Sequence, residues 1–137
     1  FSDPLTLTVA LHKATAKRVV RDLGVPTPDF TVVHTAAEAA TVDLPFPLFV
    51  KPVAAGTSQG IDGASKALTR ESLTRRCAEL AARFQQPVLV ERYLPGREVT
   101  AGVVGTGADA RGLGVMEGLL QPAADQGRRA GARRCAA

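Results

Sequence analysis

The chain has 137 residues, of which 45% are apolar and 22% are charged, with 17 Lys and Arg against 13 Asp and Glu. This size and composition fit one globular domain, or a piece of a longer protein, and exclude a wholly disordered chain. No apolar run approaches the roughly 20 residues of a membrane span, so no membrane partner is expected. Two distant cysteines, Cys77 and Cys135, give neither a disulfide framework nor a metal-binding spacing. The expected location is therefore the cytoplasm.

The net charge of +4 belongs to the carboxyl-terminal end of the chain. Four arginines and no acidic residue follow Gln126, and the remainder carries 13 basic and 13 acidic residues. Residues 121–137, rich in Gly, Ala and Arg, are therefore predicted to be a basic, disordered tail. Such a tail can bind RNA or acidic surfaces nonspecifically, but it lacks stacking aromatic residues, so we expect no specific nucleic-acid partner.

Hydrophobic spacing and turn residues predict the elements in chain order. Apolar residues at helical spacing predict helices over 12–23, 35–40 and 70–84. Short apolar or alternating runs between turn residues predict strands over 30–33, 46–50, 61–67, 88–90, 97–104 and 111–120. This order indicates an α+β fold, in which antiparallel sheets have helices packed on one face.

The central strand ends in Lys51 and runs into the small-residue loop Gly56-Thr57-Ser58-Gln59-Gly60. Glycines let several backbone N–H groups point at one anion, the hydroxyls add donors, and the lysine adds a positive charge. We interpret this stretch as a phosphate-holding element. The motif is neither a Walker A loop nor a G-x-G-x-x-G loop, and a solvated hairpin turn with an exposed lysine is the plain alternative.

Five pieces of the chain, taken in order, resemble the ATP-grasp superfamily and are most similar to D-alanine-D-alanine ligase and its relatives. They are the helix with early Lys13, Gly-Val-Pro-Thr-Pro at 24–28, Phe-Pro-Leu-Phe-Val-Lys-Pro at 46–52, Gly-Thr-Ser-x-Gly at 56–60, and Val-Leu-Val-Glu-Arg-Tyr-Leu-Pro-Gly-Arg-Glu-Val-Thr at 88–100. The resemblance covers nearly everything from Ser2 to Leu120. It implies a central subdomain over 29–90 after an amino-terminal segment over 1–28, and the first part of a grasp subdomain over 91–120.

The resemblance implies that Lys13 and Lys51 reach the α and β phosphates of ATP. It also implies that Thr57, Ser58 and the backbone at Gly60 form a flexible loop that folds over the triphosphate and excludes water. Lys13 has a plainer interpretation as a solvated residue in the first turn of its helix.

For the nucleoside, the resemblance places Glu91 at the adenine edge and Glu98 at the ribose hydroxyls. The backbone from Arg92 through Tyr93 to Leu94 would hydrogen-bond the adenine as a hinge. A carboxylate between two strands is chemically suited to accept from an amino group or a vicinal diol. The alternative for Glu91 and Arg92 is an ordinary charged pair at a strand end, and for Glu98 a surface position on an edge strand.

The family's reaction uses ATP and Mg²⁺ to convert a carboxylate into an acyl phosphate, which an amine then attacks. The implied partners are ATP and a small amino-acid or carboxylate substrate, the implied product is a peptidoglycan precursor, and a homodimer is one assembly open to full-length members. The family's Mg²⁺ ligands and catalytic arginine would follow Leu120, so we expect this chain to be inactive alone.

Two alternatives stay open: another ATP-grasp ligase, and a noncatalytic nucleotide-binding or interaction module with a basic tail. Three positions depart from the family pattern. Relatives usually carry glutamate at the position of Ala55 and an acidic residue at that of His12, and they often carry a small or basic residue at that of Gln59.

Overall fold

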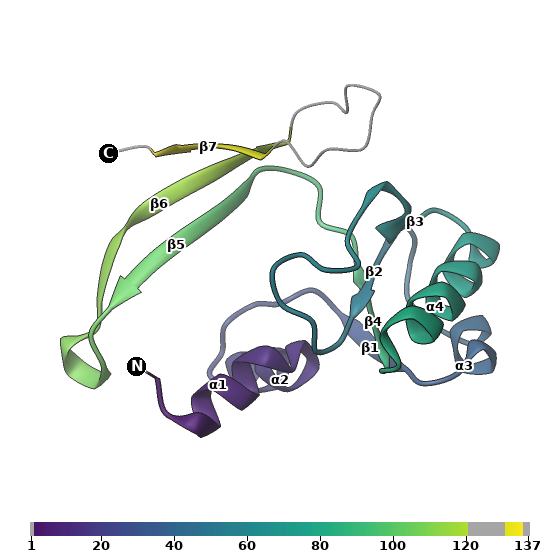
Figure 1. Ribbon diagram of the computed structural model, residues 1–137, viewed down its shortest axis with the longest axis horizontal. Helices are drawn as coiled ribbons and strands as arrows, with labels where there is room; N and C mark the ends of the chain where they lie inside the picture. Colours follow the sequence, from purple (N-terminus) through teal and green to yellow (C-terminus); the bar gives the residue numbers. More distant parts are fainter. Residues whose placement is uncertain (1, 121–130, 136–137) are drawn as a thin grey trace. The chain divides into compact units, whose positions relative to one another are not determined.

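The computed structural model describes residues 2–120 and 131–135 (Figure 1). The chain divides into two compact units, Phe1–Leu94 and Pro95–Ala137, and each is described by itself. Within the described residues, no helix is long and apolar enough to cross a membrane.

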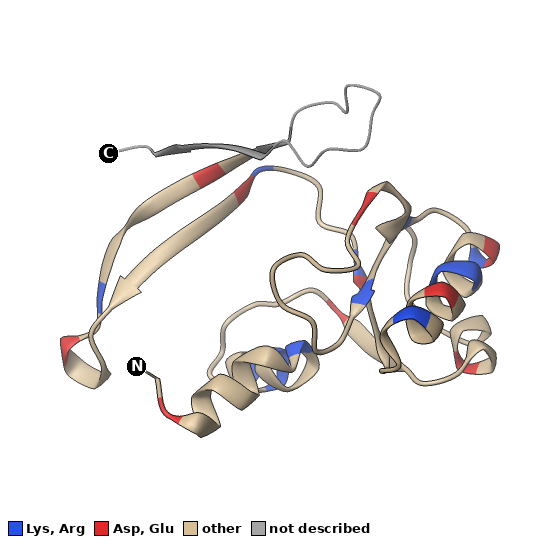
Figure 2. Cartoon of the chain, viewed as in Figure 1, with Lys and Arg blue, Asp and Glu red and all other residues tan. Residues whose placement is uncertain are grey.

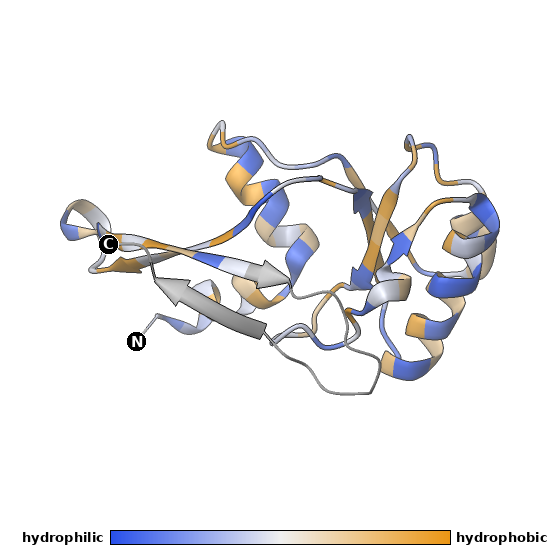
Figure 3. Cartoon of the chain, turned by 90° about the horizontal axis from the view of Figure 1, so that it is seen from above, coloured by the Kyte–Doolittle hydropathy of each residue, from blue (hydrophilic) through white to orange (hydrophobic). Residues whose placement is uncertain are grey.

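The first unit is built on a four-stranded sheet of β1 (Phe30–Val33), β2 (Leu48–Pro52), β3 (Lys66–Ala67) and β4 (Val88–Arg92). The spatial order is β1-β4-β2-β3, and every neighbouring pair is antiparallel. The two central strands β2 and β4 are rich in apolar residues, as Figure 3 shows. This composition fits their position, because a central strand is covered on both faces.

Helices α3 (Ala36–Ala40) and α4 (Arg70–Phe84) cover one face of this sheet. The buried core between them and the sheet consists of Val33, Ala39, Val42, Leu48, Val50, Ala67, Leu73, Cys77, Leu80, Val88 and Val90. Thr69 caps α4 by accepting from the backbone N–H of Ser72, and Thr35 caps α3 by accepting from that of Glu38. Each cap satisfies a backbone donor that the first turn leaves without an intrahelical partner.

The opposite face of the sheet receives α2 (Lys13–Asp22), which follows α1 (Pro4–Leu11). Ala14 of α2 is fully buried in a second apolar cluster with Val53 and Leu89. The expected fold class, α+β with antiparallel sheets, is confirmed, and α2 on the second face adds to the helices expected on the first. It is this second face that holds the candidate site.

The expected element boundaries hold closely at β1 and α4 and shift at β2, β3 and β4. β2 covers 48–52 instead of 46–50, so Lys51 lies within the strand. β4 continues past Val90 because Glu91 and Arg92 pair with Phe49 and Leu48 of β2. Only two residues of the expected strand over 61–67 pair with β2, since the 3₁₀ turn η1 (Gly63–Ser65) precedes them. The compact unit accordingly ends at Leu94, whereas the expected subdomain boundary followed residue 90.

The second unit is a three-stranded antiparallel sheet of β5 (Glu98–Val104), β6 (Arg111–Leu120) and β7 (Gly131–Cys135), in that spatial order. A short 3₁₀ turn, η2 (Gly107–Asp109), joins β5 to β6. β7 lies in the segment that composition predicts to be a disordered tail. Within it, residues 131–135 pair with the edge of β6. The rest of that segment, 121–130 and 136–137, lies outside the described residues.

Candidate functional site

Strand alternation places Lys51 and Glu91 on the face of the sheet that α3 and α4 leave uncovered. Leu48, Val50 and Pro52 of β2 are buried toward the helices, so Lys51 points the other way. Glu91 pairs in register with Phe49, the residue two positions before Lys51, and shares its face. Figure 2 shows several basic positions on α2, and β2 contributes one, Lys51. The sheet and α2 thus bring opposite charges together.

Glu91 is the centre of this arrangement. It is 7% exposed, and its Oε1 lies 2.5 Å from the Nζ of Lys51 while its Oε2 lies 2.8 Å from the Nζ of Lys17. Burial is the strongest single influence and acts to raise the pKa of Glu91, but the hydrogen bonds and charges of the two lysines together hold it below its ordinary value. Glu91 is therefore an ionised, largely buried acceptor between two cations.

Lys13 approaches the same region from the start of α2. Its backbone N–H donates to the carbonyl of Val53 (2.9 Å), and its Nζ donates to the carbonyls of Pro52 (3.0 Å) and Ala55 (2.5 Å). Burial, then the nearby charge of Lys51, lowers the pKa of Lys13. The ammonium group is thus held at the entrance of the loop by weak neutral acceptors, which a phosphate oxygen would outcompete.

His12, which occupies a position where the resemblance leads one to expect an acidic residue, caps α2. Its Nδ1 accepts from the backbone N–H of Thr15 at 3.2 Å. Capping needs only an acceptor, so the imidazole serves the role that an aspartate side chain would serve.

The loop after β2 holds several residues in the left-handed backbone region. Thr57 has φ 51°, Ser58 has φ 57° and Gly60 has φ 71°. Two backbone hydrogen bonds brace it, from the N–H of Gln59 to the carbonyl of Gly56 (3.1 Å) and from that of Ile61 to the carbonyl of Ser58 (3.2 Å). Thr57 and Ser58 are exposed. Left-handed non-glycine residues cost of order 1–3 kcal/mol each and cluster in ligand-binding loops.

The expected adenine hinge follows directly from Glu91. The N–H of Arg92 donates to the carbonyl of Asp29 (2.9 Å) and that of Tyr93 donates to the carbonyl of Pro47 (3.0 Å). The N–H of Leu94 has no partner among the residues that the structure describes. Two of the three hinge donors are thus used by the fold itself, and Leu94 offers the third.

The Tyr93 ring lies beside this hinge, between Phe49 and Lys66. Its centroid lies 6.4 Å from that of Phe49, and the Nζ of Lys66 lies 4.1 Å above its face.

Of the ten expected site residues, the structure gathers nine in the first unit. Glu98 begins β5 of the second unit, where it pairs with Gly118. Its expected contact with a ribose stays a prediction, as do the ligand contacts of the other nine.

Three residues of the site region went unnoticed in the sequence. Lys17 binds Glu91; Gln86 accepts from the N–H of Ala54 through its Oε1 at 2.6 Å; and Arg76 contacts the end of the loop. Lys17 could have been identified from the sequence, because it stands one helical turn after Lys13 and so lies on the same face of the helix. Gln86 and Arg76 could not, since their contacts depend on how α4 packs.

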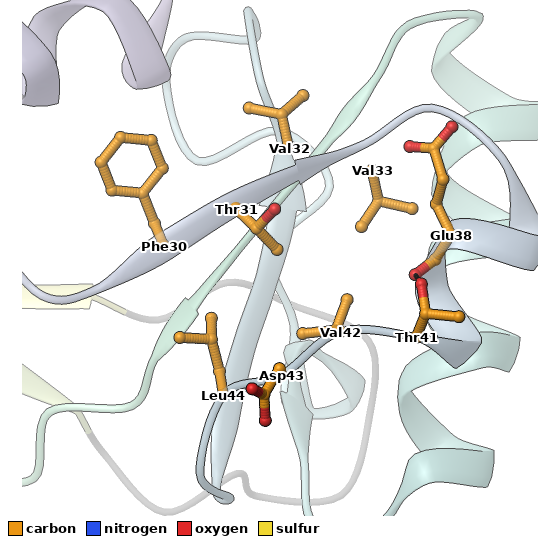
Figure 4. A pocket seen from close by; sticks show the side chains of 9 residues that line it. All are labelled: Phe30, Thr31, Val32, Val33, Glu38, Thr41, Val42, Asp43 and Leu44. Carbon is orange, nitrogen blue, oxygen red and sulfur yellow. Dashed lines mark hydrogen bonds between the residues drawn. The ribbon is translucent and has the colours of Figure 1, made fainter.

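Metal ligands are not grouped in the described part of the chain, where no set of three or more His, Cys, Asp or Glu could hold an ion. A hollow beside the edge strand β1, shown in Figure 4, does not match a triphosphate site either. Its only charged lining residues are the carboxylates Glu38 and Asp43, and it lacks the cations that a phosphate chain requires.

Sequence and structure comparisons agree on the class of this protein. The family model described as D-ala D-ala ligase C-terminus matches residues 19–120. The solved structure of VanG D-Ala:D-Ser ligase from Enterococcus faecalis superposes with a TM-score of 0.75 and 27% identity, covering 96% of this chain and 39% of that one. A D-alanine–D-alanine ligase from Bacillus anthracis, solved in complex with ATP, shares the fold at a TM-score of 0.65 and 19% identity, covering 94% of this chain and 40% of that one. The fold is thus that of part of an ATP-grasp ligase.

Curated sequences narrow the class to one family. D-alanine–D-alanine ligase from Bordetella pertussis is 39% identical over 118 residues, which are 85% of this chain and 36% of that protein. The corresponding protein of Sodalis glossinidius is 40% identical over 109 residues, 75% of this chain and 29% of that protein. The chain belongs to the D-Ala-D-Ala ligase C-terminal family, and it spans about a third of the length of these relatives.

Proposed function

We propose that this chain is the ATP-binding part of a carboxylate–amine ligase that joins two D-alanine molecules, or closely similar amino acids, through an acyl phosphate. The proposed location is the cytoplasm, and the proposed role is the supply of a peptidoglycan precursor. Within this proposal the chain binds and orients ATP, and the amino-acid sites and catalytic arginine belong to other parts of a full-length ligase. We expect the chain alone to be inactive.

One observation supports this proposal above all others: Lys17 and Lys51 both pair with a single carboxylate, Glu91, and Lys13 lies at the entrance of the loop, near enough for the charges of Lys51 and Glu91 to act on its pKa. Three cations and one anion in this region leave an excess of positive charge, which a polyphosphate would neutralise. Glu91 and the N–H of Leu94 lie three positions apart at the end of β4, where they offer an acceptor and a donor to a purine edge.

The arrangement suggests an exchange of partners when ATP binds. The Nζ of Lys51 would leave Glu91 for a phosphate oxygen, and Lys17 would stay on Glu91. Lys13 would trade the carbonyls of Pro52 and Ala55 for phosphate oxygens, an exchange that charge favours. The described residues offer no carboxylate set for Mg²⁺, so we assign no step to the metal within this chain.

Calorimetric titration with ATP and Mg²⁺ tests the proposal, with Lys51→Ala as the site variant. Arg75→Ala is the matched control, because Arg75 is an exposed cation on α4, across the sheet from the site. We expect Lys51→Ala to weaken ATP binding about ten-fold or more and Arg75→Ala to leave it within about two-fold, since only Lys51 lies at the loop. Absence of ATP binding by the folded chain, or equal losses in both variants, would reject the proposal.

A further inference from the structure

An arginine interrupts the buried apolar stripe of α4. Leu73, Cys77 and Leu80 face the core, and Arg76, between them, has a side chain that is only 3% exposed. A buried guanidinium needs partners for its charge and its donors, because desolvation is costly without them. The partners of Arg76 show what it does.

Those partners lie at the carboxyl end of the phosphate loop. Nη2 of Arg76 donates to the carbonyl of Gly60 at 3.1 Å and to Oγ of Ser65 at 3.3 Å, and it lies 2.9 Å from Oδ2 of Asp62. Nη1 pairs with Glu79 on α4 itself at 2.8 Å. Nε has no partner in the described part of the chain, so the two Nη groups make all the contacts.

Gly60 is also the point at which the loop is packed most tightly. A Cβ built there would lie 2.7 Å from Phe84 of α4 and 2.7 Å from Pro52 of β2. By contrast, nothing lies within 4 Å of such an atom at Gly56, at the other end of the loop. The loop therefore has one fixed end, at Gly60, and one open end, at Gly56.

We propose that Arg76 is a positioning residue, which fixes the Gly60 end of the loop so that Thr57 and Ser58 are presented to phosphate at a constant place. This inference rests on the function proposed above. Arg76 acts through the Gly60 carbonyl and Asp62 and itself touches no ligand. The Gly60 end of the loop then stays in place when nucleotide binds.

Two acidic partners of Arg76 provide a matched pair of variants. Asp62 and Glu79 each pair with Arg76 at nearly equal distance, and the side chains of both are 50% exposed. Asp62 lies on the loop side, and Glu79 lies on the helix. Asp62→Asn keeps an Oδ1 that can accept from the N–H of Ala64, as in the present cap, and changes only the atom that faces Arg76. Glu79→Gln makes the same chemical change on the helix side.

The experiment uses the full chain and two readouts. Amide hydrogen exchange without nucleotide follows the N–H groups of Gln59 and Ile61, which are hydrogen-bonded within the loop, and calorimetry follows ATP with Mg²⁺. We expect Asp62→Asn to speed exchange at Ile61 and to weaken ATP binding about five-fold, while Glu79→Gln changes both less than about two-fold. Arg76→Lys should restore part of what Arg76→Met loses, because a lysine can still reach the Gly60 carbonyl.

The outcomes separate this inference from the proposed function. Equal effects of Asp62→Asn and Glu79→Gln would overturn it, since they would show that Arg76 only stabilises the fold. Faster loop exchange in Asp62→Asn alone, in a chain that binds no ATP, would keep the anchoring role and reject the nucleotide site. Unchanged loop exchange in Asp62→Asn would also overturn the inference.

Discussion

The Nζ of Lys17 lies 2.8 Å from Oε2 of Glu91, and both side chains are largely buried, at 14% and 9% exposure. Lys51 occupies the other carboxylate oxygen. In the proposed exchange, Glu91 would therefore keep Lys17 while Lys51 turns toward a phosphate oxygen. That relationship separates the adenine end of the proposed site from its phosphate end.

Lys17→Met is expected to weaken ATP binding about ten-fold and to leave inorganic tripolyphosphate binding within about two-fold. In the proposed site, Lys17 holds Glu91 at the adenine edge, whereas Lys13 and Lys51 would contact the phosphates. Competition calorimetry with the two ligands measures the difference. Arg18→Met, at the next and exposed position of α2, is the control. Equal losses for ATP and tripolyphosphate would show instead that Lys17 binds phosphate directly.

Glu91→Gln is expected to change how stability depends on pH. The pKa of Glu91 is lower in the folded chain than its ordinary value of 4.5. The ionised form therefore stabilises the fold above that ordinary value, and this contribution is lost as pH falls through the lower, folded pKa. Thermal unfolding from pH 7 to pH 3 should show the variant less stable at pH 7 and the difference shrinking below about pH 4.5. A constant difference across that range would contradict the pairing.

Gly60→Ala is expected to destabilise the fold by about 2–4 kcal/mol, because it adds a Cβ in a tight space and in a left-handed backbone. The clashing atoms belong to Phe84 and Pro52. Gly56→Ala is the control, with open space and an unstrained backbone, and it should be neutral or slightly stabilising. Urea unfolding of both variants gives the comparison. Similar losses in the two would mean that Gly60 is not the fixed end of the loop.

Local sequence signals predicted the helices and strands well where residues close together in the sequence determine the backbone conformation. β1 and α4 begin and end where apolar spacing and the cap at Thr69 placed them. Boundaries shifted where pairing between distant segments decides: β4 extends to Arg92 because β2 supplies partners for it. α1 went unpredicted, because its apolar residues are exposed and show no one-sided pattern.

The candidate site could be predicted only in part for a related reason. Lys51 and the loop are adjacent in sequence, and short motifs locate them. The meeting of Lys17 with Glu91 requires that Ala14 pack against Leu89, which brings α2 over β4. Arg76 looked like an ordinary charged helix residue, since burial of a cation in an apolar stripe depends on partners from the loop. Contacts of this kind follow from packing, which the sequence pattern does not state.

Leu94→Pro is expected to weaken ATP binding about five-fold or more and to leave tripolyphosphate binding unchanged, because it removes one hydrogen-bond donor. The N–H groups of Arg92 and Tyr93 already donate to the carbonyls of Asp29 and Pro47, so in the proposed hinge that of Leu94 would be the donor to adenine. The Leu94 side chain is 64% exposed, which lets Leu94→Ala serve as the control for lost apolar contact. Calorimetric titration of both variants with ATP and with tripolyphosphate measures these affinities. If Leu94→Ala loses as much affinity as Leu94→Pro, the side chain and not the backbone contacts the nucleotide; if neither loses any, adenine does not bind at this hinge.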